Sequence, residues 1–364
     1  MLLADLKAAT SVPDDLYRRY ELYGSVINKI SKGKSPGLLL ISGGHQRDSF
    51  SSTDNHLQHF AHGAKRTQFR KAATIAFREL QSRHILPTMI IAGDPFFGLL
   101  SAFLLRKKFS RKIPIQVSFH GEITKSGFGT GIKGRLQNLF IQKTIAKVES
   151  VRLVSNDQIH FAKKLFGVVD KQIVIAPVPL ISTFKRTTRS KKKVVAFVGR
   201  IHPQRGVGTW VEAMKNLSVK AEALIIGDGP LKSTFIEDLK EIPKVSINAT
   251  GYISQSELEN TWAKISVLLS TAPFESYGMA MREAVLHGVP VVSMRNSGAQ
   301  KLHDECPKMI TLVDNAEEAA RAIEKVLDQP PSAVVVNKYK KDFLKAQESY
   351  LKSLAKSWLG TFGD

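Results

Sequence analysis

Short apolar runs alternate with longer segments of helical period along the chain, and this alternation limits the fold more than any other feature. In 207–217, for example, the apolar residues recur at the spacing of one helix face. Strand–helix alternation predicts right-handed βαβ units, parallel sheets and ligand binding at the carboxyl ends of the strands. In the second half, the predicted strands are 194–198, 223–226, 245–249, 266–270, 289–293 and 309–313.

The first half repeats this pattern less regularly. No clear strand precedes residues 37–42, so we expect either that the first βα unit is shortened and lacks its opening strand, or that sequence upstream of Met1 is missing. The two prolines at 177 and 179, followed by the polar and basic segment 182–193, are typical of a linker. The predicted strands are 37–42, 88–92, 113–119, 151–155 and 172–176, and the predicted helices are 13–31, 66–83, 96–108, 134–147 and 157–166.

A chain of 364 residues is long enough for two domains. We predict an α/β protein with one Rossmann-like domain at 1–180, a linker at 181–193 and a second Rossmann-like domain at 194–335. Residues 336–364 form a C-terminal helix, whose apolar side includes Phe343, Leu351 and Leu354.

Positive charge is concentrated in the first half. The net charge is +21, and residues 1–190 hold 30 Lys and Arg against 12 Asp and Glu, a net of +18. Such asymmetry predicts an anionic partner for the first half, and a basic surface kept for solubility is the alternative. The candidate clusters are Lys65–Arg66, Arg70–Lys71, Arg106–Lys108, Arg111–Lys112, and Lys133 with Arg135.

Several classes of protein are excluded by composition. Cys306 is the only cysteine, so an intrachain disulfide is impossible and a cysteine-based zinc site is not expected. The longest apolar run, 95–105, is much shorter than the roughly 20 residues of a membrane span. The first ten residues do not have the pattern of a signal peptide. We therefore expect a cytoplasmic protein.

The loops after the first two strands of the second half have features of an anion site. Arg200 and Arg205 lie between a predicted strand and a predicted helix start at Val207. Free N–H groups at a helix N-terminus attract anions, and arginine adds bidentate hydrogen bonds to phosphate oxygens. Gly227 ends the next strand, where a glycine lets the backbone approach a ligand closely. Either loop alone is equally consistent with an ordinary solvated turn.

The segment 273–292 carries the most specific pattern. Glu275 precedes a helix that begins near Gly278, carries Glu283 and ends at Gly288 before a strand. We expect Glu275 at the mouth of this helix and Glu283 on its buried side. Two glutamates at this spacing are common, but the full pattern of an aromatic–glycine turn, Glu-Ala and Gly-x-Pro-Val-Val is not.

These motifs resemble the GT-B fold glycosyltransferases of the glycosyltransferase family 4 type, closely over 194–313 and more loosely over 88–178. The resemblance implies that Arg200 and Arg205 clamp the diphosphate of a nucleotide sugar, although the family usually has lysine at the second position. Gly227 is included in the donor site, and the turn containing Ile253 is implied to hold the nucleobase.

The resemblance also implies roles for the helix after Gly278. Glu275 would face the donor sugar, Glu283 the ribose hydroxyls, and the backbone N–H groups of Tyr277, Gly278 and Met279 would contact the sugar. His120 follows a predicted strand in the first domain, at the place of the family's active-site histidine. The C-terminal helix is implied to pack back on the first domain.

The implied reaction is transfer of a sugar with retention of configuration. We expect no metal and no cofactor, because the chain lacks an Asp-x-Asp motif and arginines stand where a cation would neutralise the diphosphate. Retaining hydrolases use two carboxylates about 5–5.5 Å apart, and no obvious pair of that kind is present. Attack on the same face, with the leaving phosphate as base, is therefore favoured.

The predicted partners are a nucleotide sugar and an anionic or lipid-linked acceptor, such as a cell-envelope polysaccharide precursor. The basic first half also predicts peripheral contact with the anionic cytoplasmic face of a membrane. Two alternatives remain. One is a nucleotide-sugar epimerase or hydrolase on the same fold. The other is a basic nucleic-acid-binding protein, which is not favoured because the basic half lacks a zinc-finger, RRM or KH signature.

Overall fold

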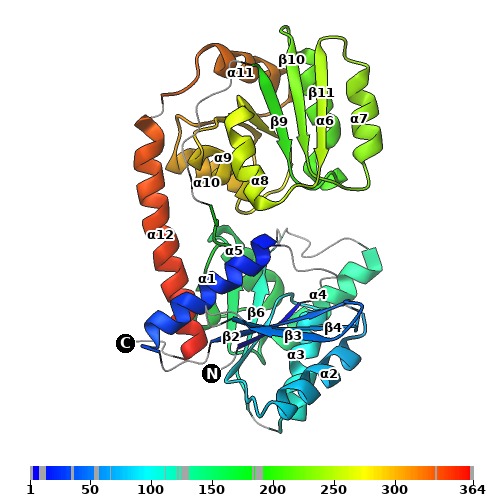
Figure 1. The fold of residues 1–364 in the computed structure, drawn as a ribbon, viewed down its shortest axis with the longest axis vertical. Coiled ribbons are helices and arrows are strands. Elements are labelled where there is room, and N and C mark those ends of the chain that lie inside the picture. Colours follow the sequence, from blue (N-terminus) through cyan, green and yellow to red (C-terminus); the bar gives the residue numbers. More distant parts are fainter. Residues whose placement is uncertain are drawn as a thin grey trace. The chain divides into compact units, whose positions relative to one another are not determined.

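The computed structural model describes residues 3–7, 14–33, 37–52, 57–65, 67–110, 112–120, 123, 131–182, 184, 192–332 and 334–360. The chain divides into two compact units (Figure 1). The first unit comprises Met1–Pro179 and Ala346–Asp364, and the second comprises Leu180–Lys345. Most of the predicted linker, at 183 and 185–191, lies outside the described residues.

The first unit is built on an eight-stranded sheet of order β3-β4-β2-β1-β5-β6-β7-β8. All neighbouring strands are parallel except β3 and β4. Its elements are β1 (Leu3–Lys7), α1 (Asp14–Ile30), β2 (Leu38–Gly43), β3 (Ser49–Ser52), β4 (Leu57–His62), α2 (Phe69–Ser82), β5 (Met89–Ala92), α3 (Phe97–Lys108), β6 (Ile115–Phe119), α4 (Gly131–Ile145), β7 (Ser150–Leu153), α5 (Asp157–Phe166), the short 3-10 helix η1 (Asp170–Gln172) and β8 (Ile173–Ile175).

The expectation of a shortened or missing first strand is wrong. β1 lies between β2 and β5, with Leu3 opposite both Leu38 and Met89. The strand has only five residues, and Asp5 and Lys7 interrupt its apolar pattern, which is why the sequence did not indicate it.

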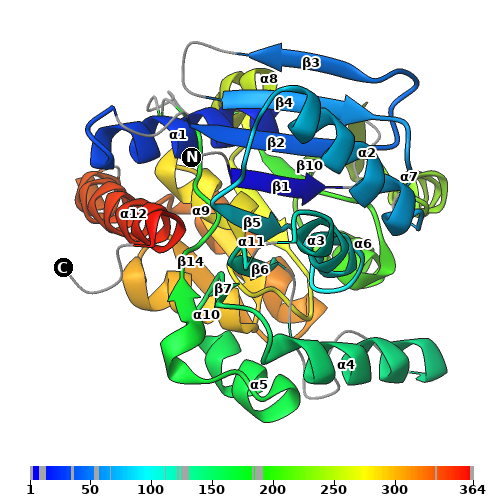
Figure 2. The ribbon, with the colours of Figure 1, turned by 90° about the horizontal axis from the view of Figure 1, so that it is seen from below.

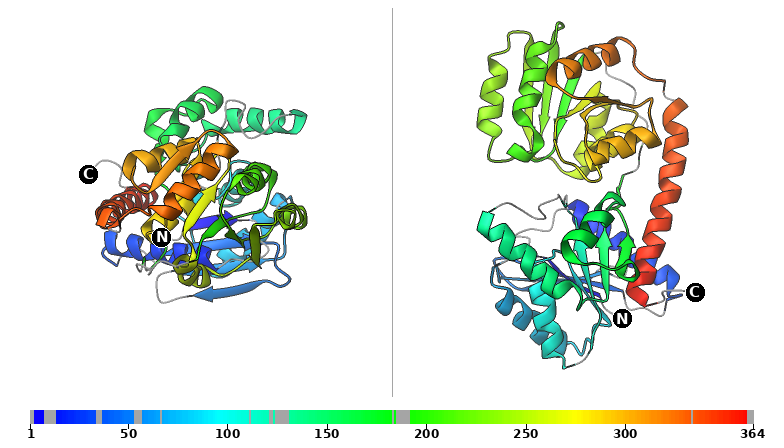
Figure 3. Two further views of the ribbon diagram at one scale, coloured as in Figure 1. Left: turned by 90° about the horizontal axis from the view of Figure 1, so that it is seen from above. Right: turned by 180° about the vertical axis from the view of Figure 1, so that it is seen from behind.

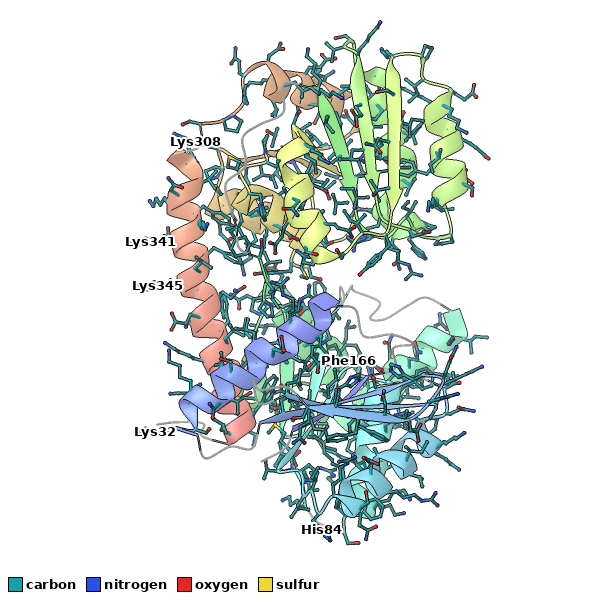
Figure 4. All side chains as sticks on the ribbon, in the orientation of Figure 1. Lys32, His84, Phe166, Lys308, Lys341 and Lys345 are labelled. Carbon is teal, nitrogen blue, oxygen red and sulfur yellow. The ribbon has the colours of Figure 1, made fainter. Side chains whose placement is uncertain are left out.

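Both faces of the first sheet are covered by helices, as expected for a parallel sheet. On one face, Leu39 and Ile41 of β2 belong to a core with apolar residues of α2 and α3. On the other face, Leu38 and Leu40 of the same strand pack in a core with α1 and the end of the last helix. Figure 2 shows these helices on the two sides of the sheet. Phe166 of α5, labelled in Figure 4, packs against Phe119 with ring centroids 5.6 Å apart.

The second unit has a six-stranded, fully parallel sheet of order β11-β10-β9-β12-β13-β14. Its helices also cover both faces of the sheet (Figure 3). Its elements are β9 (Val194–Val198), η2 (Pro203–Arg205), α6 (Val207–Asn216), β10 (Ala221–Ile226), α7 (Lys232–Lys240), β11 (Val245–Gly251), α8 (Gln255–Thr261), η3 (Trp262–Lys264), β12 (Val267–Ser270), α9 (Met279–Leu286), β13 (Val291–Met294), α10 (Ser297–Glu305), β14 (Ile310–Val313), α11 (Ala316–Asp328) and α12 (Val334–Leu359).

The last helix, α12, contributes to both cores. Tyr339 and Phe343 pack in the second unit. Leu354 and Trp358 pack in the first, where the Trp358 ring meets Tyr23 edge to face at 5.3 Å. In the described part of the chain, no helix is long and apolar enough to cross a membrane.

Candidate active site

The candidate site lies at the carboxyl edge of the second sheet. β9 is followed in the chain by β10 on one side, whereas β12 pairs with β9 on the other side. The strand order therefore reverses direction next to β9, and loops diverge from the ends of β9 and β12. Such a switch point is where open parallel sheets bind their ligands.

The loops after β9 and β10 are fixed to one another through their backbones. The Gly199 N–H donates to the Ile226 carbonyl at 2.9 Å, and the Ile201 N–H donates to the Asp228 carbonyl at 2.9 Å. Gly227 has a φ of +136°, and a Cβ there would lie 1.9 Å from the Gly199 carbonyl oxygen. Glycine is therefore required at 227 for close approach of two protein loops. The sequence interpretation, close approach of a ligand to the backbone at this glycine, stays a prediction.

Arg205 is held at the end of β12. Its carbonyl and that of Gly206 accept hydrogen bonds from the Thr271 hydroxyl at 3.1 and 2.9 Å. A Cβ at Gly206 would lie 2.0 Å from the Thr271 carbonyl, so only glycine allows this approach. The second predicted arginine, Arg200, is exposed on the same loop. α6 begins directly afterwards at Val207, as the sequence predicted.

The structure brings Arg205 and Glu275 together. The guanidinium Nη1 lies 2.5 Å from the carboxylate Oε2, with 43% and 22% of the two side chains exposed. The Glu275 carbonyl accepts hydrogen bonds from the Gly298 N–H at 2.7 Å and the Ser297 hydroxyl at 3.2 Å, both at the start of α10. The loop that carries Glu275 is therefore tied to the next strand–helix connection.

α9 begins at Met279, four residues after Glu275, and carries the second glutamate. Gly278 is its N-cap with a φ of +73°, which favours glycine, and Met279 is its first residue. Glu283 is 6% exposed, on the buried side of the helix as expected. Its carboxylate accepts a hydrogen bond from the Gln255 amide of α8. Gln255 is the first residue of α8 and lies two residues after Ile253, so this hydrogen bond links Glu283 to the segment that follows the predicted nucleobase turn.

A pocket of about 380 Å³, counting the space at its open mouth, lies among these groups. Its polar lining includes Arg205, Glu275, Ser270 and Thr271, and its apolar lining includes Met281. Gly278, at the start of α9, also lines it. The pocket therefore combines a cation, a carboxylate and a helix N-terminus, a combination that suits an anionic, hydroxyl-rich ligand. Among the described residues, no group of three or more His, Cys, Asp or Glu could hold a metal ion.

His120 belongs to the first unit. It follows β6 directly and is exposed, and the next two residues lie outside the described part of the chain. Because β6 is parallel to β5 and β7, His120 stands at the carboxyl edge of the first sheet. His120 therefore follows a strand, as the sequence predicted, and its role in the reaction stays a prediction.

Other histidines of the first unit form a polar group with their own partners. Ser42 on β2 shares its hydroxyl with the Nε2 atoms of His45 and His59, at 2.7 and 2.8 Å. Burial, with a smaller effect of His45, lowers the pKa of His59. Burial also lowers the pKa of His62 to about 4, although Asp48 opposes this shift. Nothing in the sequence pattern indicates a function for these residues.

Sequence reasoning missed Arg282 and Gln255. Arg282 is 1% exposed on α9, and its guanidinium donates to the Tyr277 carbonyl at 3.0 Å and lies over the Tyr277 ring. It also pairs with Glu305 of α10 and donates to the Tyr339 hydroxyl of α12 at 3.1 Å. Within the sequence, Arg282 looks like a surface residue beside Glu283. Only the packing of α9 between α10 and α12 gives it a structural role.

Two Rossmann-like units in one chain, with a pocket at the switch point of the second sheet, are the architecture expected of the GT-B fold. Residues 181–343 match the family described as glycosyl transferases group 1. This segment, which lies mostly within the second unit, is similar to that glycosyltransferase family, and the similarity supports the resemblance at that level.

Two curated relatives illustrate the match. The GDP-mannose-dependent alpha-mannosyltransferase of Corynebacterium glutamicum is 30% identical over 141 residues, 38% of this chain and 32% of that protein. The putative teichuronic acid biosynthesis glycosyltransferase TuaC of Bacillus subtilis is 23% identical over 271 residues, 70% of this chain and 65% of the relative. The chain therefore spans about a third of the first relative and just under two thirds of the second.

Solved structures share the fold over the whole chain. HepE of Anabaena, in complex with UDP and glucose, superposes with a TM-score of 0.72 at 15% identity and full coverage of both chains. WaaG, a glycosyltransferase involved in lipopolysaccharide biosynthesis, has a TM-score of 0.70 at 14% identity, covering 98% of this chain and 100% of that one. These likenesses confirm the predicted GT-B fold.

Proposed function

We propose that the chain transfers a sugar from a nucleotide-diphosphate sugar to an acceptor. The observation that carries this proposal is the pocket at the switch point of the second sheet, which brings Arg205, Glu275 and the start of α9 together within the family-matched segment. UDP in the HepE complexes and the GDP-mannose dependence of the corynebacterial relative support a nucleotide donor.

In this proposal, Arg200 and Arg205 contact the diphosphate, the N–H groups at Tyr277, Gly278 and Met279 contact the sugar, and Glu283 accepts hydrogen bonds from the ribose. The Arg205–Glu275 ion pair opens when the donor binds, so that the arginine meets phosphate and Glu275 meets the sugar. A partly exposed pair of this kind contributes only about 0–1 kcal/mol, so its opening costs little.

The proposed transfer retains configuration and needs no metal. The bond between the anomeric carbon and the diphosphate oxygen breaks while the acceptor oxygen attacks from the same face. The acceptor proton passes to the leaving phosphate. Arg200, Arg205 and the helix N-terminus stabilise the charge on the leaving diphosphate. His120 and Glu275 hold the transferred sugar; the role of His120 rests on the resemblance.

The proposed acceptor is a lipid-linked or other anionic precursor of a cell-envelope polysaccharide, used at the cytoplasmic face of the membrane. The net charge of +18 on residues 1–190 supports an anionic partner. The teichuronic acid and lipopolysaccharide pathways of two similar proteins point to the same class of acceptor.

The test is a panel of UDP- and GDP-sugars scored first for thermal stabilisation and then for transfer, with and without EDTA. We expect one donor to stabilise the protein and to support transfer that survives the chelator. Loss of transfer in EDTA, restored by Mg²⁺, would contradict the metal-free mechanism. Release of free sugar without an acceptor would indicate a hydrolase. Salt-sensitive DNA binding without donor binding would indicate a nucleic-acid-binding protein.

A further inference from the structure

Helix α4 of the first unit is apolar on two opposite sides. One side packs into the unit through Gly134, Ile141 and Ile145, which are buried. The opposite side carries Ile132, Leu136 and Leu139, which are 80%, 61% and 46% exposed. We call these three residues the outward face of α4. Figure 2 shows α4 beside α5 at one edge of the first unit.

A helix at a protein surface normally has one apolar face, which is turned to the core. Eight large hydrophobic side chains are exposed in the described part of the chain, and three of them form the outward face. The other five are spread over different elements. Single exposed apolar residues need no explanation, but a continuous stripe at i, i+4 and i+7 indicates an interaction surface.

The charged residues of α4 itself are all positive. α4 carries Lys133, Arg135 and Lys143, all exposed, and has no acidic residue between Gly131 and Ile145. At 100° per residue, Arg135 and Lys133 fall on opposite sides of the apolar stripe, and Lys143 lies one turn beyond Leu139. An apolar stripe bordered by basic residues is the pattern of a helix that lies in the interface of an anionic membrane.

We propose that the outward face of α4 docks on an anionic lipid bilayer. Ile132, Leu136 and Leu139 enter the boundary between headgroups and acyl chains, and Lys133, Arg135 and Lys143 contact the anionic headgroups. A second copy of the chain fits less well. Three side chains offer far less than the roughly 800 Å² per partner of a stable protein interface, and the helix has no acidic group to pair with its bases.

The outward face of α4 differs from another of the basic clusters, in which an arginine already has partners within the protein. Arg106 at the end of α3, the first member of another candidate cluster, already donates to the Lys147 carbonyl and pairs with Glu149 at 3.5 Å.

The inference rests on the proposed function only in that a lipid-linked acceptor gives the enzyme a reason to reach the membrane. Binding itself is measured without donor or acceptor.

The experiment is co-sedimentation of the full chain with vesicles of phosphatidylcholine alone, or of equal parts phosphatidylcholine and phosphatidylglycerol. We expect binding to the anionic vesicles only, reversed by salt. The variants are Leu136→Ser with Leu139→Ser, and Lys133→Gln with Arg135→Gln. Each double variant should lower the partition coefficient at least tenfold, since each basic residue contributes about fivefold.

The matched controls are Lys341→Gln with Lys345→Gln, and Leu344→Ser, all exposed on α12 (Figure 4 labels the two lysines). These controls should bind as the unaltered chain does. Unchanged vesicle binding by both α4 variants, or no binding to anionic vesicles, would overturn the proposal. If the unaltered chain is a dimer and the variant with Leu136→Ser and Leu139→Ser is a monomer, the outward face binds a second copy of the chain and not a bilayer. Calorimetry with UDP and GDP separates the two proposals, because the α4 variants leave the nucleotide site untouched.

Discussion

At the scale of single residues, the two arginines after β9 have different surroundings, so we expect their substitutions to affect catalysis differently. Arg200 is exposed, whereas Arg205 is fixed by Glu275 and Thr271. Arg200→Ala removes a charge that should stabilise the leaving diphosphate, so we expect kcat/KM to fall about a hundredfold or more. Arg205→Lys keeps its charge and should retain most activity. Arg321→Ala, exposed on α11, is the control for steady-state kinetics. Normal kinetics for Arg200→Ala would remove that residue from the site.

The two glutamates should also separate by role. Glu283 is buried and bonded to Gln255, so Glu283→Gln should mainly weaken binding of the free nucleoside diphosphate. Glu275 lines the pocket beside Arg205, so Glu275→Gln should mainly lower kcat. Calorimetry measures the first effect and saturating kinetics the second. Nucleotide binding by Glu283→Gln as tight as in the unaltered chain would contradict the ribose role.

The lowered pKa of His62 leads us to expect a smaller free energy of unfolding in acid. Its pKa is about 4 in the folded chain and 6.5 in the reference state. Between these values the unfolded chain binds a proton that the folded chain does not. The free energy of unfolding should therefore fall as the pH drops from 6.5 to 4, by up to about 3 kcal/mol.

Urea unfolding at pH 7 and pH 4.5 measures the effect. His62→Gln should remove this part of the pH dependence, whereas His160→Gln, exposed on α5, should leave it in place. An unchanged slope in His62→Gln would assign the acid sensitivity to other groups.

At the scale of elements, apolar strands and well-separated helices were predictable, and polar strands were not. β9 was predicted at its observed bounds, and α6 within one residue, because each has a clear period and a glycine beside it. β3 and β4 were missed, because serines and histidines interrupt their alternation, and only pairing in the sheet makes them strands.

The contacts among α9, α10 and α12 could not be predicted, since they join residues far apart in the chain. Arg282 is buried against Glu305 and Tyr339. Its burial opposes the charge, but its partners hold the pKa of the guanidinium above the usual value. Arg282→Met leaves Glu305 without its buried partner, so we expect a loss of about 3 kcal/mol in the free energy of unfolding.

Urea denaturation measures this loss. The control is Arg295→Met, which breaks an exposed pair with Asp314 and should cost about 0–1 kcal/mol. Equal effects of the two substitutions would mean that the buried network around Arg282 adds nothing beyond a surface ion pair. A fall in donor affinity in Arg282→Met alone would show that the network also positions the loop at Tyr277.

At the scale of the whole molecule, the sequence predicted two Rossmann-like units but not how the chain is shared between them. The carboxyl edge of the second unit was predictable in detail, because its motifs are contiguous and each follows a strand. Glu275 and Arg205 were both selected, yet their mutual ion pair was not foreseen, since 70 residues separate them. The packing of α12 in the cores of both units could not be predicted from its amphipathic pattern either. That pattern indicates an apolar side of the helix but not the core that this side contacts.

The division of α12 leads to a prediction for the two cores. Trp358 is buried in the first unit, meets Tyr23 edge to face, and donates through Nε1 to the Gln116 side chain at 2.6 Å. Trp358→Ala leaves a cavity and a buried amide without that partner, so the first unit should lose about 3–5 kcal/mol. The second unit has separate cores and should still bind UDP or GDP.

Calorimetric unfolding should show one transition shifted to lower temperature and the other, which nucleotide stabilises, unmoved. Leu344→Ala, exposed on the same helix, is the control, and an equal shift of both transitions in Trp358→Ala would mean that the units unfold as one.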